Sequence, residues 1–258
     1  MNASSTATAY SDFDQWNAKD YLREYYSELM ADERFALEFL VDSVRAMGRI
    51  PLALDVGCGP CVHHVFPLVP KVKEVHLADF VASNRDEIHL WLERSKQAHD
   101  WTEFAAETLR LETGKRPTAA QVRAREQKAR SCISEVLSAD IRAADPLGPA
   151  ARGRYPLVTA HYCAEAISTE KAVFRSNVHN ISSLVAQGGT LIVSACGAAD
   201  HYKVGERHFP ASRATAEDML SALQREAFGS IDLRVRLTPS HTTQGYSSVI
   251  FARGTRLT

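Results

Sequence analysis

The residues best suited to chemistry follow an apolar run in the first quarter of the chain. Residues 51–60 read Pro-Leu-Ala-Leu-Asp-Val-Gly-Cys-Gly-Pro, which is typical of a buried parallel strand ending in an acid and a Gly-x-Gly turn. Gly57 and Gly59 lack a Cβ atom, so the backbone there can turn sharply and approach a ligand closely. Asp55 offers a carboxylate to a cationic group. Together these features predict a nucleotide-cofactor loop at the end of a strand.

The loop favours S-adenosylmethionine over a dinucleotide. It lacks the third glycine that packs helix against strand beneath the pyrophosphate of NAD or FAD. Two other interpretations use its cysteines: a thioredoxin-like redox turn at Cys58-Gly-Pro-Cys61, or a zinc site of Cys58, Cys61, His63 and His64. The redox turn lacks the tryptophan that precedes the first cysteine of thioredoxins, and a tight Gly-Pro turn rarely supplies four convergent ligands. We therefore predict no metal site.

Three tyrosines precede this loop within six residues. Tyr21, Tyr25 and Tyr26 belong to a segment, 16–47, in which apolar and aromatic residues recur at helical spacing, with Asp32 as the expected cap between two helices. The tyrosines can simply pack against the core. Their rings can also face a sulfonium and their hydroxyls can reach a carboxylate, and S-adenosylmethionine carries both groups.

A second acid ends the next predicted strand, at 72–79. Asp79 lies at the distance from the glycine loop where a ribose-binding carboxylate belongs. The alternative is a helix cap, although Ser83 and Asn84 could cap the following helix equally well.

The remaining elements alternate in a way that predicts an α/β fold with a mostly parallel sheet. Further strands are expected at 133–140, 155–160, 190–195, 231–237 and 246–252, and helices at 84–98 and 118–131. The last two strands have no helix between them, so we expect them to be antiparallel. We divide the chain into a disordered tail (1–9), a helical cap over the cofactor (10–48) and a main domain (49–258) with a helical insertion (100–131).

Composition excludes several classes of protein. With 258 residues, 45% hydrophobic and 24% charged, the chain can bury a full core, and its net charge of -1 gives no electrostatic reason to bind nucleic acid. Five cysteines at irregular spacing do not suggest a secreted disulfide framework. No run resembles a signal peptide or a membrane span, so we expect a cytoplasmic protein without a membrane partner. The oligomeric state stays open.

The motifs resemble those of the nicotinamide, phenylethanolamine and thioether N-methyltransferases. The family pattern Asn-Pro-Arg-Asp-Tyr-Leu-x-x-Tyr-Tyr is matched by residues 17–26, and Asp-(Ile/Val)-Gly-(Ser/Cys)-Gly-Pro by 55–60. Further matches are Asp79 with Asn84, Asp100-Trp101, Asp140, Thr159-Ala160, Glu165-Ala166 and residues 202–206. The resemblance implies a Rossmann-like class I methyltransferase fold: a seven-stranded, mostly parallel sheet with an antiparallel last strand, helices on both faces and amino-terminal helices over the cofactor.

The resemblance also implies the residues that hold S-adenosylmethionine, whose product is S-adenosylhomocysteine. It assigns the methionine carboxylate to Tyr21 and Tyr26, the ribose to Asp79 and Asn84, and the adenine to Asp140 and Ile141. The full cofactor set is Tyr21, Tyr25, Tyr26, Asp55, Gly57, Cys58, Gly59, His63, Asp79, Phe80, Asn84, Asp140, Ile141, Thr159 and Ala160. His63 stands where the family has a tyrosine.

The acceptor side departs from the family. Ala199 and Gln244 occupy positions where alkylamine-methylating members carry acids. The expected acceptor residues are Tyr21, His161, Tyr162, Glu165, His201, Tyr202, Gln244 and Tyr246. This set suits a flat, largely neutral heteroaromatic acceptor, such as an indole methylated at carbon 3 or a ring nitrogen in bacterial natural-product synthesis. Alternatives are an amine N-methyltransferase and a non-catalytic binding protein with the same fold.

Methyl transfer from sulfonium is an in-line displacement, so alignment and water exclusion should supply most of the acceleration. For an indole carbon, positive charge develops on the ring N–H, where a base within hydrogen-bond reach can remove the proton. Glu165 is the first candidate, followed by His161, with Tyr26 beside them as a catalytic side chain. The alternatives are a structural acid for Glu165 and a packed core histidine for His161.

Overall fold

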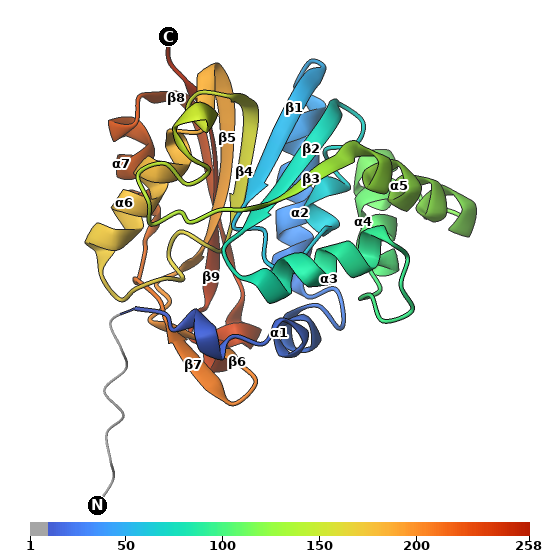
Figure 1. The fold of residues 1–258 in the computed structure, drawn as a ribbon, viewed down its shortest axis with the longest axis horizontal. Helices are drawn as coiled ribbons and strands as arrows, with labels where there is room; N and C mark the ends of the chain where they lie inside the picture. Colours follow the sequence, from blue (N-terminus) through green and yellow to red (C-terminus); the bar gives the residue numbers. More distant parts are fainter. Residues whose placement is uncertain (1–9) are drawn as a thin grey trace, which may run out of the picture.

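One twisted sheet of seven strands organises the molecule (Figure 1). The computed structural model describes residues 10–258, so the predicted disordered tail at 1–9 lies outside the described residues. The strand order is β3-β2-β1-β4-β5-β9-β8. The bounds are β1 Ile50–Val56, β2 Val72–Asp79, β3 Ile133–Ser138, β4 Tyr155–His161, β5 Val185–Gly197, β8 Phe228–Leu237 and β9 Ser248–Arg256.

The directions of the strands confirm the predicted sheet. Strands β1 to β5 pair in parallel, whereas β9 runs antiparallel to both of its neighbours, β5 and β8. The central strands read as apolar runs because both of their faces are covered. Parallel strands all end at the same edge of the sheet, which brings the residues that follow β1 to β5 close together.

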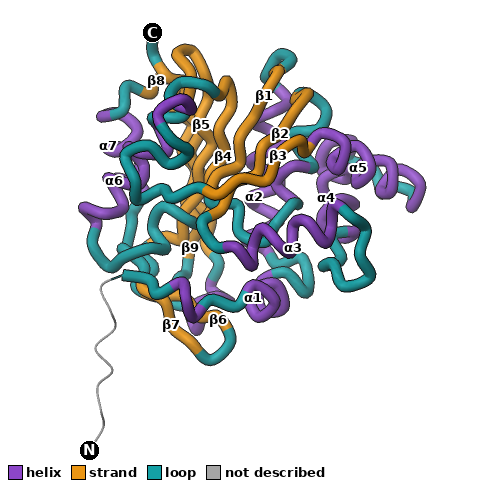
Figure 2. Tube along the Cα trace, viewed as in Figure 1, coloured by secondary structure: helices purple, strands orange, loops and turns teal. Residues whose placement is uncertain are grey.

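Helices cover both faces of the sheet, as Figure 2 shows. Their bounds are α1 Ala18–Tyr25, α2 Ala31–Arg45, α3 Ala82–Leu92, α4 Thr102–Thr113, α5 Ala119–Cys132, α6 Lys171–Ser182 and α7 Ala216–Arg225. Side chains of α2 to α5 form one apolar cluster with the sheet, and side chains of α6 and α7 form a second. The predicted insertion contributes to the first cluster, since Trp101 and Phe104 are almost completely buried there.

The first helix and a small hairpin lie beside each other at one end of the sheet (Figure 1). The hairpin, β6 His201–Val204 and β7 Arg207–Pro210, is not among the predicted elements. The Tyr25 hydroxyl donates to the carbonyl of Lys203 at 2.8 Å, and the amide of Gly205 donates to Glu24 at 2.9 Å. These long-range bonds fix α1 against the hairpin.

Two local predictions are wrong. The third helix ends at Leu92 instead of residue 98, because Arg94 adopts a left-handed conformation (φ 59°) and the chain turns there. Asp32 does not cap the second helix: it lies in the first turn of α2, where its carboxylate accepts a hydrogen bond from Tyr246 at 2.8 Å. In the described part of the chain, no helix is long and apolar enough to cross a membrane.

Candidate active site

A cavity opens where strands β1 to β5 end. Its lining comes from the segments after these strands, from α1, from the start of α2 and from the hairpin. The predicted residues that line it are Tyr21, Tyr25, Tyr26, Gly57, Cys58, Gly59, Asp79, Phe80, Asn84, Asp140, Ile141, His161, Tyr162, Glu165, Tyr202 and Tyr246. The structure does not bring six others to the lining: Asp55, His63, Thr159, Ala160, His201 and Gln244.

The glycine loop has the geometry that its sequence predicts. Gly57 and Gly59 have positive φ values of 66° and 61°, a conformation that favours glycine. A Cβ atom on Gly57 would lie 2.6 Å from the side chain of Cys163, which is closer than atoms can approach. The Gly57 amide donates to the carbonyl of Ala78 at 2.8 Å, which ties the loop to the end of β2. Only glycine fits this position.

Asp79 joins the loop to the following helix. One carboxylate oxygen accepts from the amide of Gly59 at 2.8 Å, and the other accepts from the Val81 amide and the Asn84 side chain, both at 2.9 Å. Burial raises the pKa of Asp79, although these donors oppose the shift. Asp79 therefore stabilises the start of α3, as a helix cap does. It also lines the cavity, where a ligand can contact it.

Asp55 is completely buried and does not line the cavity. Its Oδ1 accepts from the Thr159 hydroxyl at 2.8 Å, and its Oδ2 has no hydrogen bond and lies 3.8 Å from Nδ1 of His64. Complete burial raises the pKa of Asp55 to about 6. The residues that this carboxylate faces are thus Thr159 and His64 of the same chain.

The tyrosines of α1 both pack and hydrogen-bond. The hydroxyls of Tyr21 and Tyr26 are 3.4 Å apart, and the Tyr26 hydroxyl donates to Oε1 of Glu33 at 3.4 Å. Trp16 stacks at a tilt on Tyr21 and donates from its indole nitrogen to Asn84 at 2.7 Å. Trp16 therefore ties the segment before α1 to Asn84, one of the two predicted ribose-binding residues.

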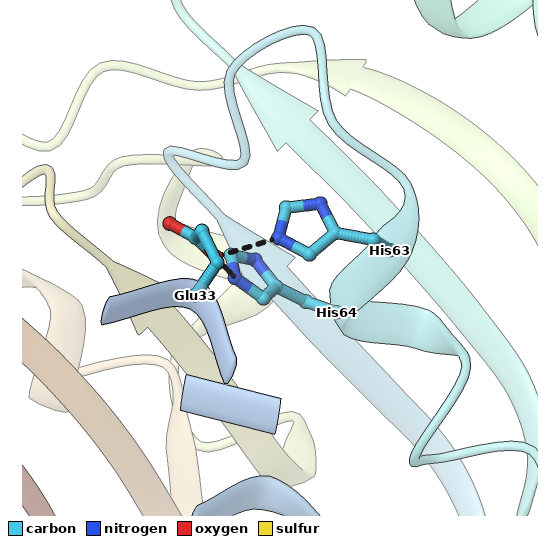
Figure 3. Close-up of side chains that lie close together, drawn as sticks. All are labelled: Glu33, His63 and His64. Atoms are coloured by element: carbon cyan, nitrogen blue, oxygen red, sulfur yellow. Dashed lines mark hydrogen bonds and ion pairs between the residues drawn. The ribbon is translucent and has the colours of Figure 1, made fainter. Parts of the chain in front are cut away.

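Sequence reasoning missed Glu33 and considered His64 only in the rejected zinc site, although both residues line the cavity. Glu33 Oε2 lies 3.0 Å from Nε2 of His63 and 3.8 Å from Nε2 of His64 (Figure 3). Burial opposes ionisation of Glu33, but the two histidines outweigh it and hold the pKa of Glu33 well below its usual range. Burial lowers the pKa of His63 to about 4. Tyr26 caps the end of α1 and Glu33 lies in the first turn of α2, so no helical spacing in the sequence connects the two.

His161 is the last residue of β4, and Glu165 lies in the segment that follows this strand, beside the end of β5. Oε1 of Glu165 accepts from the amide of Cys196 at 2.7 Å, whereas Oε2 has no hydrogen-bond partner in the described part of the chain. Burial raises the pKa of Glu165 to about 7. His161 pairs through Nδ1 with the Ser194 hydroxyl at 2.9 Å, and burial holds its pKa well below the usual value. Each residue therefore keeps one polar atom free.

The other acceptor residues divide into two groups. Tyr202 and Tyr246 line the cavity, together with Tyr162. His201 instead pairs with Asp200 at 2.6 Å on the hairpin, and Gln244 pairs with His241 at 2.6 Å. Besides Asp79, three buried carboxylates line the cavity: Asp32, Glu33 and Glu165.

The far end of the cavity is more exposed. Asp140 forms two hydrogen bonds of 2.8 Å with the Arg142 guanidinium, which lies 4.4 Å from the centre of the Phe80 ring. Ile141 is buried beside them. An apolar floor and an exposed ring provide a flat surface for a planar group.

The cysteines of the loop lie in an environment that disfavours the thiolate form. Cys58 and Cys61 are buried and free, and burial raises the pKa of both thiols well above its usual value. Redox-active and metal-bound cysteines require the opposite shift.

If the seven strands of the main sheet are numbered along the chain without the hairpin, their order is 3-2-1-4-5-7-6. This order, together with the glycine loop and the acid at the end of β2, defines a class I methyltransferase. Residues 4–252 match the NNMT/PNMT/TEMT family, to which the chain belongs. It is therefore an S-adenosylmethionine-dependent methyltransferase, as its motifs predict.

Known relatives are similar over most of the chain. Phenylethanolamine N-methyltransferase of Sus scrofa is 27% identical over 199 residues, which is 76% of this chain and 69% of the relative. Indolethylamine N-methyltransferase of Oryctolagus cuniculus is 26% identical over 217 residues, 81% of each protein. The crystal structure of the N-methyltransferase NodS of Bradyrhizobium japonicum with S-adenosylhomocysteine shares the fold, with a TM-score of 0.52 at 15% identity over 93% of this chain and 99% of NodS.

The raised pKa of Glu165 predicts a pH-dependent stability difference. A carboxyl whose pKa is higher in the folded state stabilises the fold at low pH, and this stability is lost as pH rises towards about 7. Glu165→Gln cannot ionise and can still accept from the Cys196 amide. We expect the free energy of unfolding of the variant, relative to wild type, to rise by about 2 kcal/mol between pH 5 and pH 8. Urea titrations of both proteins at pH 5 and pH 8 measure this free-energy difference. A difference that is the same at both pH values would contradict the raised pKa of Glu165.

Proposed function

We propose that this methyltransferase transfers a methyl group to an indole or another flat heteroaromatic small molecule in bacterial secondary metabolism. The observation that carries the proposal is the unpaired oxygen of Glu165, which is buried beside the cavity among aromatic side chains. We further infer that the enzyme acts in the cytoplasm, without nucleic-acid or membrane partners.

The cofactor would lie along the ends of β1 to β3. Asp79 and Asn84 would bind the ribose, and Asp140 and Ile141 would hold the adenine, with Phe80 beside them on the cavity lining. The methionine end would lie over Gly57 towards the α1 tyrosines, whose rings favour a sulfonium. Residues 10–48 would act as a helical cap over it. Bound in this way, S-adenosylmethionine supplies an activated methyl group.

The acceptor would occupy the part of the cavity near Glu165. Tyr162, Tyr202 and Tyr246 supply aromatic surface there. Methyl transfer to indole carbon 3 would leave the electron pair of the broken methyl–sulfur bond on sulfur and positive charge on the ring nitrogen. The carboxylate of Glu165 would then take the ring N–H proton. His161, whose Nε2 has no hydrogen-bond partner in the described residues, would assist, and the Tyr26 hydroxyl would orient the reactants.

A second candidate is an amine N-methyltransferase. The specific observation in its favour is the set of buried carboxylates at the cavity, Asp32, Glu33 and Glu165, since buried acids can hold a protonated amine. The relatives named phenylethanolamine and indolethylamine N-methyltransferase agree with this chemistry. The two candidates differ in the atom that receives the methyl group.

A screen with isotopically labelled S-adenosylmethionine separates the two. We expect label in tryptophan-derived and other indolic compounds at a rate well above that for phenylethanolamines and simple alkylamines. Mass spectrometry detects the transfer, and NMR of the product locates the methyl group. Reactions without enzyme and reactions with excess S-adenosylhomocysteine serve as controls. Preferred methylation of an aliphatic amine would replace the first proposal with the second.

A further inference from the structure

His64 is a buried histidine that none of the roles above uses. Its side chain is 3% exposed, and neither ring nitrogen has a hydrogen-bond partner in the described part of the chain. A buried polar group without a partner costs free energy, so such groups usually bind water, an ion or a ligand. The position is therefore a candidate for binding something the polypeptide itself does not provide.

The atoms around His64 are spaced as metal ligands are. Glu33 Oε2 lies 3.0 Å from Nε2 of His63 and 3.8 Å from Nε2 of His64 (Figure 3). The three ligand atoms all fall within 4.8 Å of one another. Four-coordinate zinc with bonds of about 2.0–2.1 Å keeps its ligand atoms about 3.3 Å apart. Small side-chain movements would thus bring all three atoms to one ion.

The Asp55 carboxylate lies near the second ring nitrogen of His64. Asp55 Oδ2 lies 3.8 Å from Nδ1 of His64, on the opposite side of the ring from Glu33, and it too has no hydrogen bond. Histidines that bind metals commonly donate their second ring nitrogen to a carboxylate, which orients the ring. This arrangement explains two buried unpaired groups at once.

The candidate site also opens on the cavity. Glu33 and His64 line the cavity, so a bound ion would complete its coordination with a water or with an oxygen or nitrogen atom of a small molecule there.

We propose that Glu33, His63 and His64 bind one divalent transition-metal ion of the zinc class on the cavity wall, with Asp55 orienting His64. This set contains neither cysteine of the Cys58-Gly-Pro-Cys61 turn, so it differs from the zinc site considered from the sequence.

Titration of chelator-treated full-length protein with Zn²⁺ and Co²⁺ tests the proposal. We expect one ion per chain by calorimetry, and a Co²⁺ spectrum with visible bands of a four- or five-coordinate ion but without thiolate charge-transfer absorption. His64→Gln should weaken binding at least about 100-fold, and Asp55→Asn about 10- to 100-fold. His76→Gln is the matched control, because His76 is a buried histidine outside the cluster that pairs with Tyr155 at 3.1 Å. It should bind like wild type.

Unchanged affinity in His64→Gln, or no binding to wild type beyond weak surface sites, would overturn the proposal. If His64→Gln does not fold, X-ray absorption of the zinc-loaded wild type decides the question. Two imidazoles with oxygen ligands are expected, and a sulfur shell would contradict the assignment.

Discussion

Asp79→Ala is expected to weaken S-adenosylmethionine binding by about 100-fold or more. Two hydrogen bonds from ribose hydroxyls to a carboxylate contribute roughly 1.5–3 kcal/mol each, and about 1.4 kcal/mol corresponds to a factor of ten. The variant also removes the acceptor for the Gly59 and Val81 amides, so the glycine loop loses its attachment to the start of α3. Calorimetry with S-adenosylmethionine measures the change.

Glu74→Ala provides the matched control for this variant. Glu74 lies on the same strand, is partly exposed and pairs only with Lys73 in the described structure, far from the cavity lining. Its replacement should leave cofactor affinity unchanged. If Asp79→Ala binds S-adenosylmethionine as tightly as wild type while remaining folded, Asp79 has no place in the cofactor site.

Glu165→Gln is expected to lower turnover of an indolic acceptor by about 10²- to 10⁴-fold, the usual contribution of a general base. An amide can neither take the ring proton nor balance the positive charge. Because the pKa of Glu165 is about 7, wild-type turnover should rise with pH up to about 7 and level off above it, as the carboxylate becomes ionised. In Glu165→Gln, turnover should not show this rise with pH. Cofactor affinity should not change.

Initial rates from pH 5.5 to 8.5 measure both effects. Glu170→Gln is the matched control, since Glu170 is an exposed carboxylate at the start of α6 and does not line the cavity. An indolic substrate methylated by Glu165→Gln at a rate near that of wild type would remove the base role.

The sheet and the cofactor edge of the cavity could be predicted because their signals are local. Strands β1 and β2 are mostly apolar runs with an acid at or next to their last position, and parallel strands end at a common edge, so Gly57, Asp79 and Asp140 were expected to meet there. The tyrosine motif before the first strand added the amino-terminal helices through its resemblance to a family. That the family match spans residues 4–252 confirms the resemblance.

The place of Asp32 and Glu33 on the cavity lining could not be predicted, because it depends on tertiary contacts. Asp32 and Glu33 occupy the first turn of α2, a position where acids normally need no further explanation. Their partners come from distant segments: Tyr246 is 214 positions from Asp32, and His63 is 30 positions from Glu33. Hydrophobic periodicity carries no information about such pairs. The same limit explains why His201 and Gln244 were expected at the cavity but pair with neighbours outside it.

The most direct test is a crystal structure of the full chain with S-adenosylhomocysteine bound. We predict ribose hydroxyls within hydrogen-bond distance of the Asp79 carboxylate, the sulfur over the glycine loop and facing Tyr21 and Tyr26, and open space between the sulfur and Glu165 for the acceptor. A product molecule bound elsewhere, or one whose ribose does not contact Asp79, would contradict this account of the site.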